Sequence, residues 1–198
     1  MPGNWNLLCK RLNIDSSTIV FEKKSLLNDA FLGHLSGAMV PKTHVYIRSD
    51  VDPRLEEYIR AHELCHYYLI FEQGYYFFLD EKGTDDPLFS LIMSFSHHFT
   101  IDCILKDCFF DIEQWHQKQY LYCTNAARNG FSSDLDAVGK TLNLIELDYW
   151  LKNNAVKKLK KSFIKHNTKC TKLFQFAEKN LKEIIKKELC LNPKVRRK

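Results

Sequence analysis

The sequence lacks the features that mark membrane-spanning and secreted proteins. No stretch of its 198 residues approaches the roughly 18 uninterrupted apolar residues of a transmembrane helix, and residues 1–11 hold no apolar run long enough for a signal peptide. Its seven cysteines are odd in number and scattered, and no C-x-x-C pair occurs among them. We therefore expect reduced thiols, no membrane contact and a cytoplasmic location.

Negative charge is nearly missing from the end of the chain. Residues 151–198 contain 16 lysines or arginines and 3 acidic residues, whereas residues 1–150 contain 13 basic and 21 acidic residues. This division predicts a body at residues 1–150 and a basic helical extension at residues 151–198. Lysine-rich helices attract nucleic acid or acidic partners by charge, so nucleic acid is a candidate partner of the extension. The alternative is a solvated helical face.

Helical periodicity dominates the chain, and strand signals are few. Residues 17–21 and 43–48 are rich in β-branched and aromatic side chains and predict two strands. The second strand is a candidate for pairing with an extended substrate. Helices are expected at residues 4–12, 26–35, 53–70, 87–107, 111–128, 133–151 and 154–191, the last of them interrupted near residues 166–168.

One short motif points to a specific chemistry. His62, Glu63 and His66 form the pattern H-E-x-x-H. On a helix, residues four apart lie one turn above each other, so the two imidazoles can share one metal ion while Glu63 reaches a water on that metal as a general base. With 8 histidines and 11 glutamates in the chain, roughly 0.02 such matches are expected by chance.

The residues around the motif predict the helix that it needs. Asp52 can cap this helix, and Pro53 suits its first turn. The two histidines border an apolar stripe, where burial is costly unless something satisfies their ring nitrogens. A metal ion would satisfy them, and the alternative is a hydrogen-bonded pair of core histidines. The stripe consists of Ala61, Leu64, Cys65 and Tyr68.

A catalytic zinc normally has three protein ligands and one water, so the motif leaves one ligand to be found. The predicted helix at residues 87–107 offers His98, which continues its apolar stripe, and Asp102 one turn further on. We expect His98 as the third ligand, with Asp102 either orienting it or replacing it. The alternatives are His97, which points about 100° away on the helix, and a His98–Asp102 hydrogen bond without metal.

The predicted strand and residues 60–67 (RAHELCHY) together resemble the ImmA/IrrE-type zinc metallopeptidases of bacteria and their mobile elements. The resemblance covers roughly residues 40–110. It implies a zincin-like fold, a zinc-bound water, and cleavage of a protein partner such as a repressor. The family's third ligand is typically a glutamate on the following helix, and this chain has no glutamate between Glu81 and Glu113.

The function expected is therefore a cytoplasmic zinc metallopeptidase that hydrolyses a peptide bond in one protein partner, of the regulator or repressor class. The expected fold is α+β, mainly α, with a zincin-like core and a small β-sheet in residues 1–150 and a helical extension in residues 151–198. One alternative is a catalytically silent zincin-like binding or scaffold module. The other is a nucleic-acid-associated regulator that works through its basic C-terminal helices.

Overall fold

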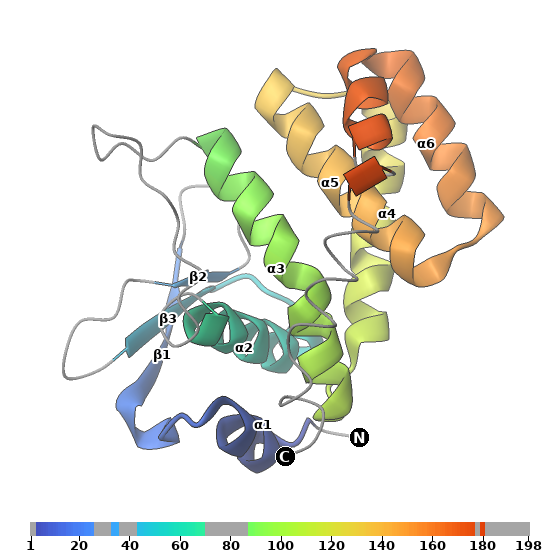
Figure 1. The fold of residues 1–198 in the computed structure, drawn as a ribbon. Helices are drawn as coiled ribbons and strands as arrows, with labels where there is room; N and C mark the ends of the chain where they lie inside the picture. The colour runs from blue at the N-terminus through green and yellow to red at the C-terminus, as the bar shows by residue number, and fades with distance from the viewer. Residues whose placement is uncertain (1–2, 26–32, 36–42, 70–86, 177–178, 181–198) are drawn as a thin grey trace. The chain divides into compact units, whose positions relative to one another are not determined.

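The protein is mainly helical with a small β-sheet, as the sequence predicts. No helix in the described part of the chain is both long and apolar enough to cross a membrane. The helices are α1 (Trp5–Leu12), α2 (Pro53–Tyr67), α3 (Pro87–Asp107), α4 (Ile112–Asn129), α5 (Asp134–Leu151) and α6 (Asn154–His166) (Figure 1). The strands are β1 (Ile19–Lys24), β2 (Gly33–Leu35) and β3 (Thr43–Arg48). The computed structural model describes residues 3–25, 33–35, 43–69, 87–176 and 179–180.

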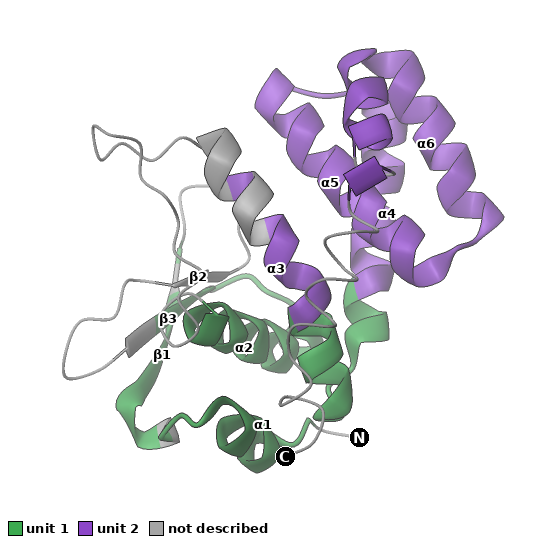
Figure 2. Cartoon of the chain, in the orientation of Figure 1, with its two compact units in different colours: residues 1–78, 101–115 green, residues 79–100, 116–198 purple. Residues whose placement is uncertain are grey.

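The chain divides into two compact units, each with its own apolar core (Figure 2). Unit 1 comprises residues 1–78 and 101–115, and unit 2 comprises residues 79–100 and 116–198. The predicted boundary after residue 150 does not coincide with this division. The reason is that α5 and α6 pack against each other within unit 2, where the buried side chains of α6 join the same apolar cluster as those of α5.

The sheet of unit 1 has β3 in its centre, in the order β1-β3-β2. β1 pairs with β3 in parallel along its whole length, and β2 pairs with β3 antiparallel opposite residues 45–47. Because both edges of β3 are paired there, the expectation that this strand accepts an extended substrate is wrong. Residues 33–35 form β2 and do not end a helix, and the rest of the helix predicted at residues 26–35 lies outside the described residues.

The helix α2 begins where the sequence predicts because its first turn is capped. The Asp52 carboxylate accepts a hydrogen bond of 3.0 Å from the backbone N–H of Arg54, and Pro53 takes the first helical position. Glu56 lies in the first turn, where the helix dipole favours an acidic side chain, and forms an ion pair of 2.6 Å with Lys23 of β1. These contacts fix the start of α2 beside the sheet.

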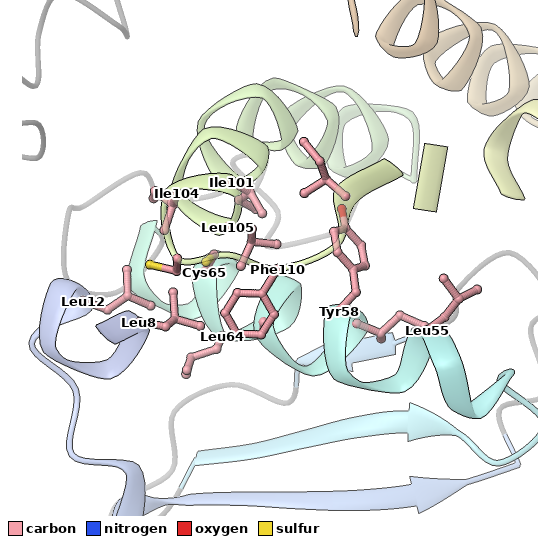
Figure 3. Packing of buried hydrophobic residues seen from close by; sticks show 14 of the residues in the cluster. Leu8, Leu12, Leu55, Tyr58, Leu64, Cys65, Ile101, Ile104, Leu105 and Phe110 are labelled. Carbon is pink, nitrogen blue, oxygen red and sulfur yellow. The ribbon is translucent and has the colours of Figure 1, made fainter. Parts of the chain in front are cut away.

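The core of unit 1 determines which face of α2 is buried (Figure 3). Leu64 and Cys65 of α2 are fully buried together with Leu8 of α1 and Leu105 of α3. Each buried leucine contributes roughly 1.5–3 kcal/mol relative to an exposed one, so rotating α2 about its axis would be costly. The packing therefore holds the neighbouring face of α2, which carries the motif histidines, at the edge of the core.

The middle of α3 is buried more completely than an amphipathic helix requires. Phe95, His97 and Phe99 are all nearly buried, with exposed fractions of 6%, 2% and 3%. Alternate residues of a helix point in opposite directions, so burial of all three means that α3 is covered on more than one side. For this reason His97 is buried although it lies outside the predicted apolar stripe.

Candidate metal centre

The helix α2 brings the two motif histidines together in unit 1. The Nε2 atoms of His62 and His66 lie 3.1 Å apart, and the two rings are nearly perpendicular, at 77°. Both side chains are buried, with exposed fractions of 8% and 7%. Glu63, which follows the first histidine directly, has a half-buried side chain.

The spacing of these two nitrogens fits a shared metal ion. Two imidazole nitrogens on a tetrahedral zinc, each at about 2.0–2.1 Å from the ion, lie roughly 3.3 Å apart. The 3.1 Å between the Nε2 atoms of His62 and His66 is close to this value. The same distance also suits a hydrogen bond in which one nitrogen donates to the other. Geometry at this pair therefore accommodates zinc, and metal analysis separates the two possibilities.

A tyrosine and a buried carboxylate fix the orientation of His62. The Tyr58 hydroxyl donates to Asp102 Oδ1 at 3.0 Å and lies 3.3 Å from Nδ1 of His62. Because the single hydroxyl proton goes to the carboxylate, the tyrosine oxygen accepts from Nδ1–H of the imidazole. This tautomer leaves the lone pair of His62 on Nε2, the atom that faces His66, which is the form that binds a metal.

The same contacts give Asp102 a defined place. Its side chain is fully buried in unit 1 and reaches His62 through Tyr58, on the Nδ1 side of the ring. The two motif imidazoles face each other through Nε2, on the opposite side. Of the two roles expected for Asp102, orienting a ligand therefore agrees better with these contacts than replacing one, and the imidazole that the contacts reach is that of His62.

The other residue expected as a ligand, His98, belongs to unit 2. Its Nδ1 lies 3.0 Å from Oε2 of Glu146, a residue of α5 whose side chain is fully buried. The Gln119 amide donates to the same carboxylate oxygen at 3.1 Å. Next to it, burial lowers the pKa of His97 to about 4, and the neighbouring His98 contributes to the shift. The partner that the structure gives to Nδ1 of His98 is therefore Glu146.

Two residues that contact expected ligands, one in each unit, were not identified from the sequence, although the sequence contains a signal for each. Tyr58 lies one turn before His62 on α2, so the residues 58, 62 and 66 follow one another at intervals of four. Glu146 interrupts the apolar residues of α5 and continues a stripe that includes Leu142. An acidic residue on the apolar side of a helix is buried only with a polar partner, and that partner is usually functional or structural.

Cys65 of the motif and Cys123 of unit 2 are packed thiols. Burial raises the pKa of Cys65 well above its ordinary value, with smaller contributions from Cys108 and nearby charges. In unit 2, burial raises the pKa of Cys123 to about 12, and the Glu146 carboxylate adds to the effect. Metal binding and nucleophilic attack both need the thiolate, which these surroundings disfavour.

Comparison with protein-family models, with curated proteins and with solved structures finds no match to this chain. The resemblance to ImmA/IrrE-type peptidases therefore remains an expectation from the sequence. The arrangement of side chains around the motif carries the functional proposal.

Proposed function

We propose that this chain is a zinc-dependent metallopeptidase with a zincin-like core, which hydrolyses a peptide bond in a protein partner. The observation that carries the proposal is the buried pair of imidazoles on α2, whose Nε2 atoms face each other at 3.1 Å. Tyr58, which is itself bonded to Asp102, fixes the orientation of His62 on the Nδ1 side of the ring. A half-buried glutamate, Glu63, lies between the two histidines in the sequence, where the H-E-x-x-H motif has its general base.

The proposed ligands of Zn²⁺ are His62, His66 and His98. His98 is chosen because it lies one turn before Asp102 on α3, and Asp102 is joined to His62 through Tyr58. Its Nδ1 is bonded to a carboxylate, which leaves Nε2 for a metal. Asp102 is proposed as an orienting residue, with direct ligation by Asp102 as the alternative that metal analysis of variants separates.

The residues around the proposed site have distinct tasks in peptide hydrolysis. Zinc would supply a Lewis acid that polarises the scissile carbonyl and activates a water. The Glu63 carboxylate would take the proton of the attacking water and deliver it to the leaving amine. Tyr58 would keep His62 from turning, because a rotation of the imidazole ring would break the hydrogen bond between Nδ1 and the Tyr58 hydroxyl, and Asp102 holds that hydroxyl in place.

The test of catalysis is the variant Glu63→Gln, which removes the general base and leaves the proposed ligands in place. We expect it to bind zinc as the wild type does and to lose peptide cleavage by about a hundredfold or more. Cleavage is measured by mass spectrometry after incubating each protein with a proteome-derived peptide mixture and zinc. Glu57→Gln, which makes the same change elsewhere on α2, serves as the matched control and is expected to cleave normally.

Two results would count against this mechanism. If Glu63→Gln cleaves as fast as the wild type, Glu63 is not the base. If the wild type binds zinc and cleaves no peptide or candidate partner, a zincin-like binding or scaffold module with a structural metal is the better account. A chain that binds no zinc at all would favour the same module without metal.

The partner proposed for the peptidase is a protein of the regulator or repressor class, and the proposed location is the cytoplasm. Both proposals follow from the resemblance around residues 60–67 and from the cysteine usage. Among the described residues, the outer strands β1 and β2 are the ones left for pairing with an extended substrate, because β3 is central.

Nucleic acid is a second proposed partner, through the exposed lysines of α6. Lys157, Lys158, Lys161 and Lys165 are exposed, whereas the apolar side of the same helix is buried in unit 2. Lysines on a solvated face bind phosphates without reading base sequence. A regulator that binds nucleic acid mainly through this surface is therefore the second candidate function.

The double variant Lys157→Glu and Lys161→Glu tests this surface, since the two residues lie one turn apart on α6. We expect weaker binding to arbitrary duplex DNA and a salt dependence, as the slope of log K against log salt, that is shallower by about 2. The measurement is fluorescence anisotropy over a range of salt concentrations. Lys10→Glu with Lys106→Glu, two exposed lysines of α1 and α3, is the control. Equal effects of both pairs, or no binding by the wild type at low salt, would remove the proposal.

A further inference from the structure

The most unusual polar residue of unit 2 is Glu146. Its side chain is fully buried on α5, between apolar residues of the unit 2 core such as Ile145 and Leu147. A carboxylate in such surroundings costs free energy unless donors or cations compensate it. Its position therefore calls for partners that hold it there.

Two donors meet the same oxygen of this carboxylate. Oε2 of Glu146 accepts from the Gln119 amide at 3.1 Å and lies 3.0 Å from Nδ1 of His98. The other oxygen, Oε1, has no hydrogen-bond partner among the described residues. A third polar side chain, His116, brings a ring nitrogen within 4.8 Å of this carboxylate and stacks on Trp150. Glu146 is thus held by Gln119 and directed at His98.

The contact with Glu146 determines which nitrogen of His98 carries the proton. An ionised carboxylate can only accept hydrogen bonds, so Nδ1 of His98 has to be the donor. In the neutral imidazole the lone pair then lies on Nε2, the nitrogen that points away from the carboxylate. This is the tautomer in which a histidine binds a metal through Nε2.

We propose that Glu146 is a positioning residue, which holds His98 in the tautomer with Nδ1 protonated and so strengthens metal binding through Nε2. The inference rests on the proposed function, in which His98 is a zinc ligand. It also makes the two expected ligands alike, because each has a buried carboxylate behind Nδ1: Glu146 directly for His98, and Asp102 through Tyr58 for His62.

The test is the variant Glu146→Gln, which is nearly equal in size. A glutamine can accept from Nδ1–H through its oxygen or donate to Nδ1 through its NH₂, so it no longer selects one tautomer. We expect zinc to bind about 10- to 100-fold more weakly, with one ion still bound at saturation. Affinity is measured on the full chain by competition with a chelating dye. Glu113→Gln, at an exposed position of α4, is the control and should leave the affinity unchanged.

A second readout does not depend on metal or on activity. In the metal-free protein labelled with ¹⁵N-histidine, long-range ¹H–¹⁵N spectra at neutral pH report the tautomer of each imidazole, and the signal of His98 is identified by its loss in His98→Gln. We expect Nδ1 protonated and Nε2 unprotonated in the wild type, and a mixture of tautomers in Glu146→Gln. If Glu146→Gln does not fold, the wild-type spectrum still tests whether His98 carries its proton on Nδ1.

The outcomes separate this inference from the proposed function. If the wild type binds zinc and Glu146→Gln binds it equally well, the inference alone is wrong. It is also wrong if His98 carries its proton on Nε2 or on both nitrogens, or if Glu146→Gln lowers the number of ions bound at saturation, which would make Glu146 a ligand. If the wild type binds no zinc, the proposed function fails, and the tautomer still shows whether Glu146 acts on His98.

Discussion

Replacing His66 with alanine is expected to abolish stoichiometric zinc binding. The wild type should carry one zinc ion per chain after dialysis against a limited excess of metal, because His62 and His66 present their Nε2 atoms to each other at 3.1 Å. A single remaining imidazole of this pair should bind about a hundredfold more weakly or worse, since losing even a residue that only supports a ligand costs 10- to 100-fold. Metal content is measured by elemental analysis of the purified full chain.

The stability of the protein should follow the metal. At a free zinc concentration of 100 times the dissociation constant, binding stabilises the wild type by about 2.7 kcal/mol, which raises the melting temperature by roughly 5–10 °C. His66→Ala should show no such rise between chelator and zinc. His166→Ala removes an imidazole that is exposed on α6 and bonded to the Ala127 carbonyl, and it should keep both the ion and the thermal shift. A full complement of zinc in His66→Ala would show that the buried pair is only a hydrogen bond.

Replacing Asp102 with alanine is expected to weaken zinc binding without removing the site. The change takes away the acceptor of the Tyr58 hydroxyl, so that Tyr58 can donate to Nδ1 of His62 and move the imidazole proton to Nε2. Affinity should fall by about 10- to 100-fold, with one ion still bound at saturation. Losing a buried acceptor should also lower the free energy of unfolding by about 1–3 kcal/mol.

A comparison with His98→Ala identifies the third ligand. His98→Ala should lower the affinity for zinc more than Asp102→Ala does, because His98 is a proposed ligand and Asp102 only orients one. Asp107→Ala serves as the control on the same helix, since its carboxylate is half exposed and pairs with Arg11. The opposite order, with the ion lost from Asp102→Ala and kept by His98→Ala, would make Asp102 the ligand.

The part of the site that depends on a single helix could be predicted from the sequence. The cap at Asp52 and Pro53, and the spacing of His62 and His66, act within a few residues of the chain, so the start of α2 and the approach of the two imidazoles follow from local geometry. The helix at residues 87–107 was predicted with the bounds of α3 for the same reason.

The contacts between distant segments could not be predicted in this way. Glu146 and His98 are 48 residues apart, and nothing in either helix alone indicates that they meet. The sequence around residues 33–35 favours a helix by itself. These three residues instead form β2, where they pair with β3. The spacing of four residues between Tyr58 and His62 is visible in the sequence. The hydrogen bond from the Tyr58 hydroxyl to Asp102, 44 residues away, is not.

The aromatic neighbours of the motif give the protein a built-in optical reporter. The Trp115 indole stacks on Tyr58, with centroids 5.3 Å apart, and its centroid lies 6.3 Å from that of His62. A paramagnetic ion such as cobalt(II) quenches the emission of a nearby indole, so occupancy at His62 should be readable from intrinsic fluorescence without any label. Titrations on microgram amounts of unmodified protein then become practical, and Trp115→Phe, which keeps Trp5 and Trp150, shows how much of the signal comes from Trp115.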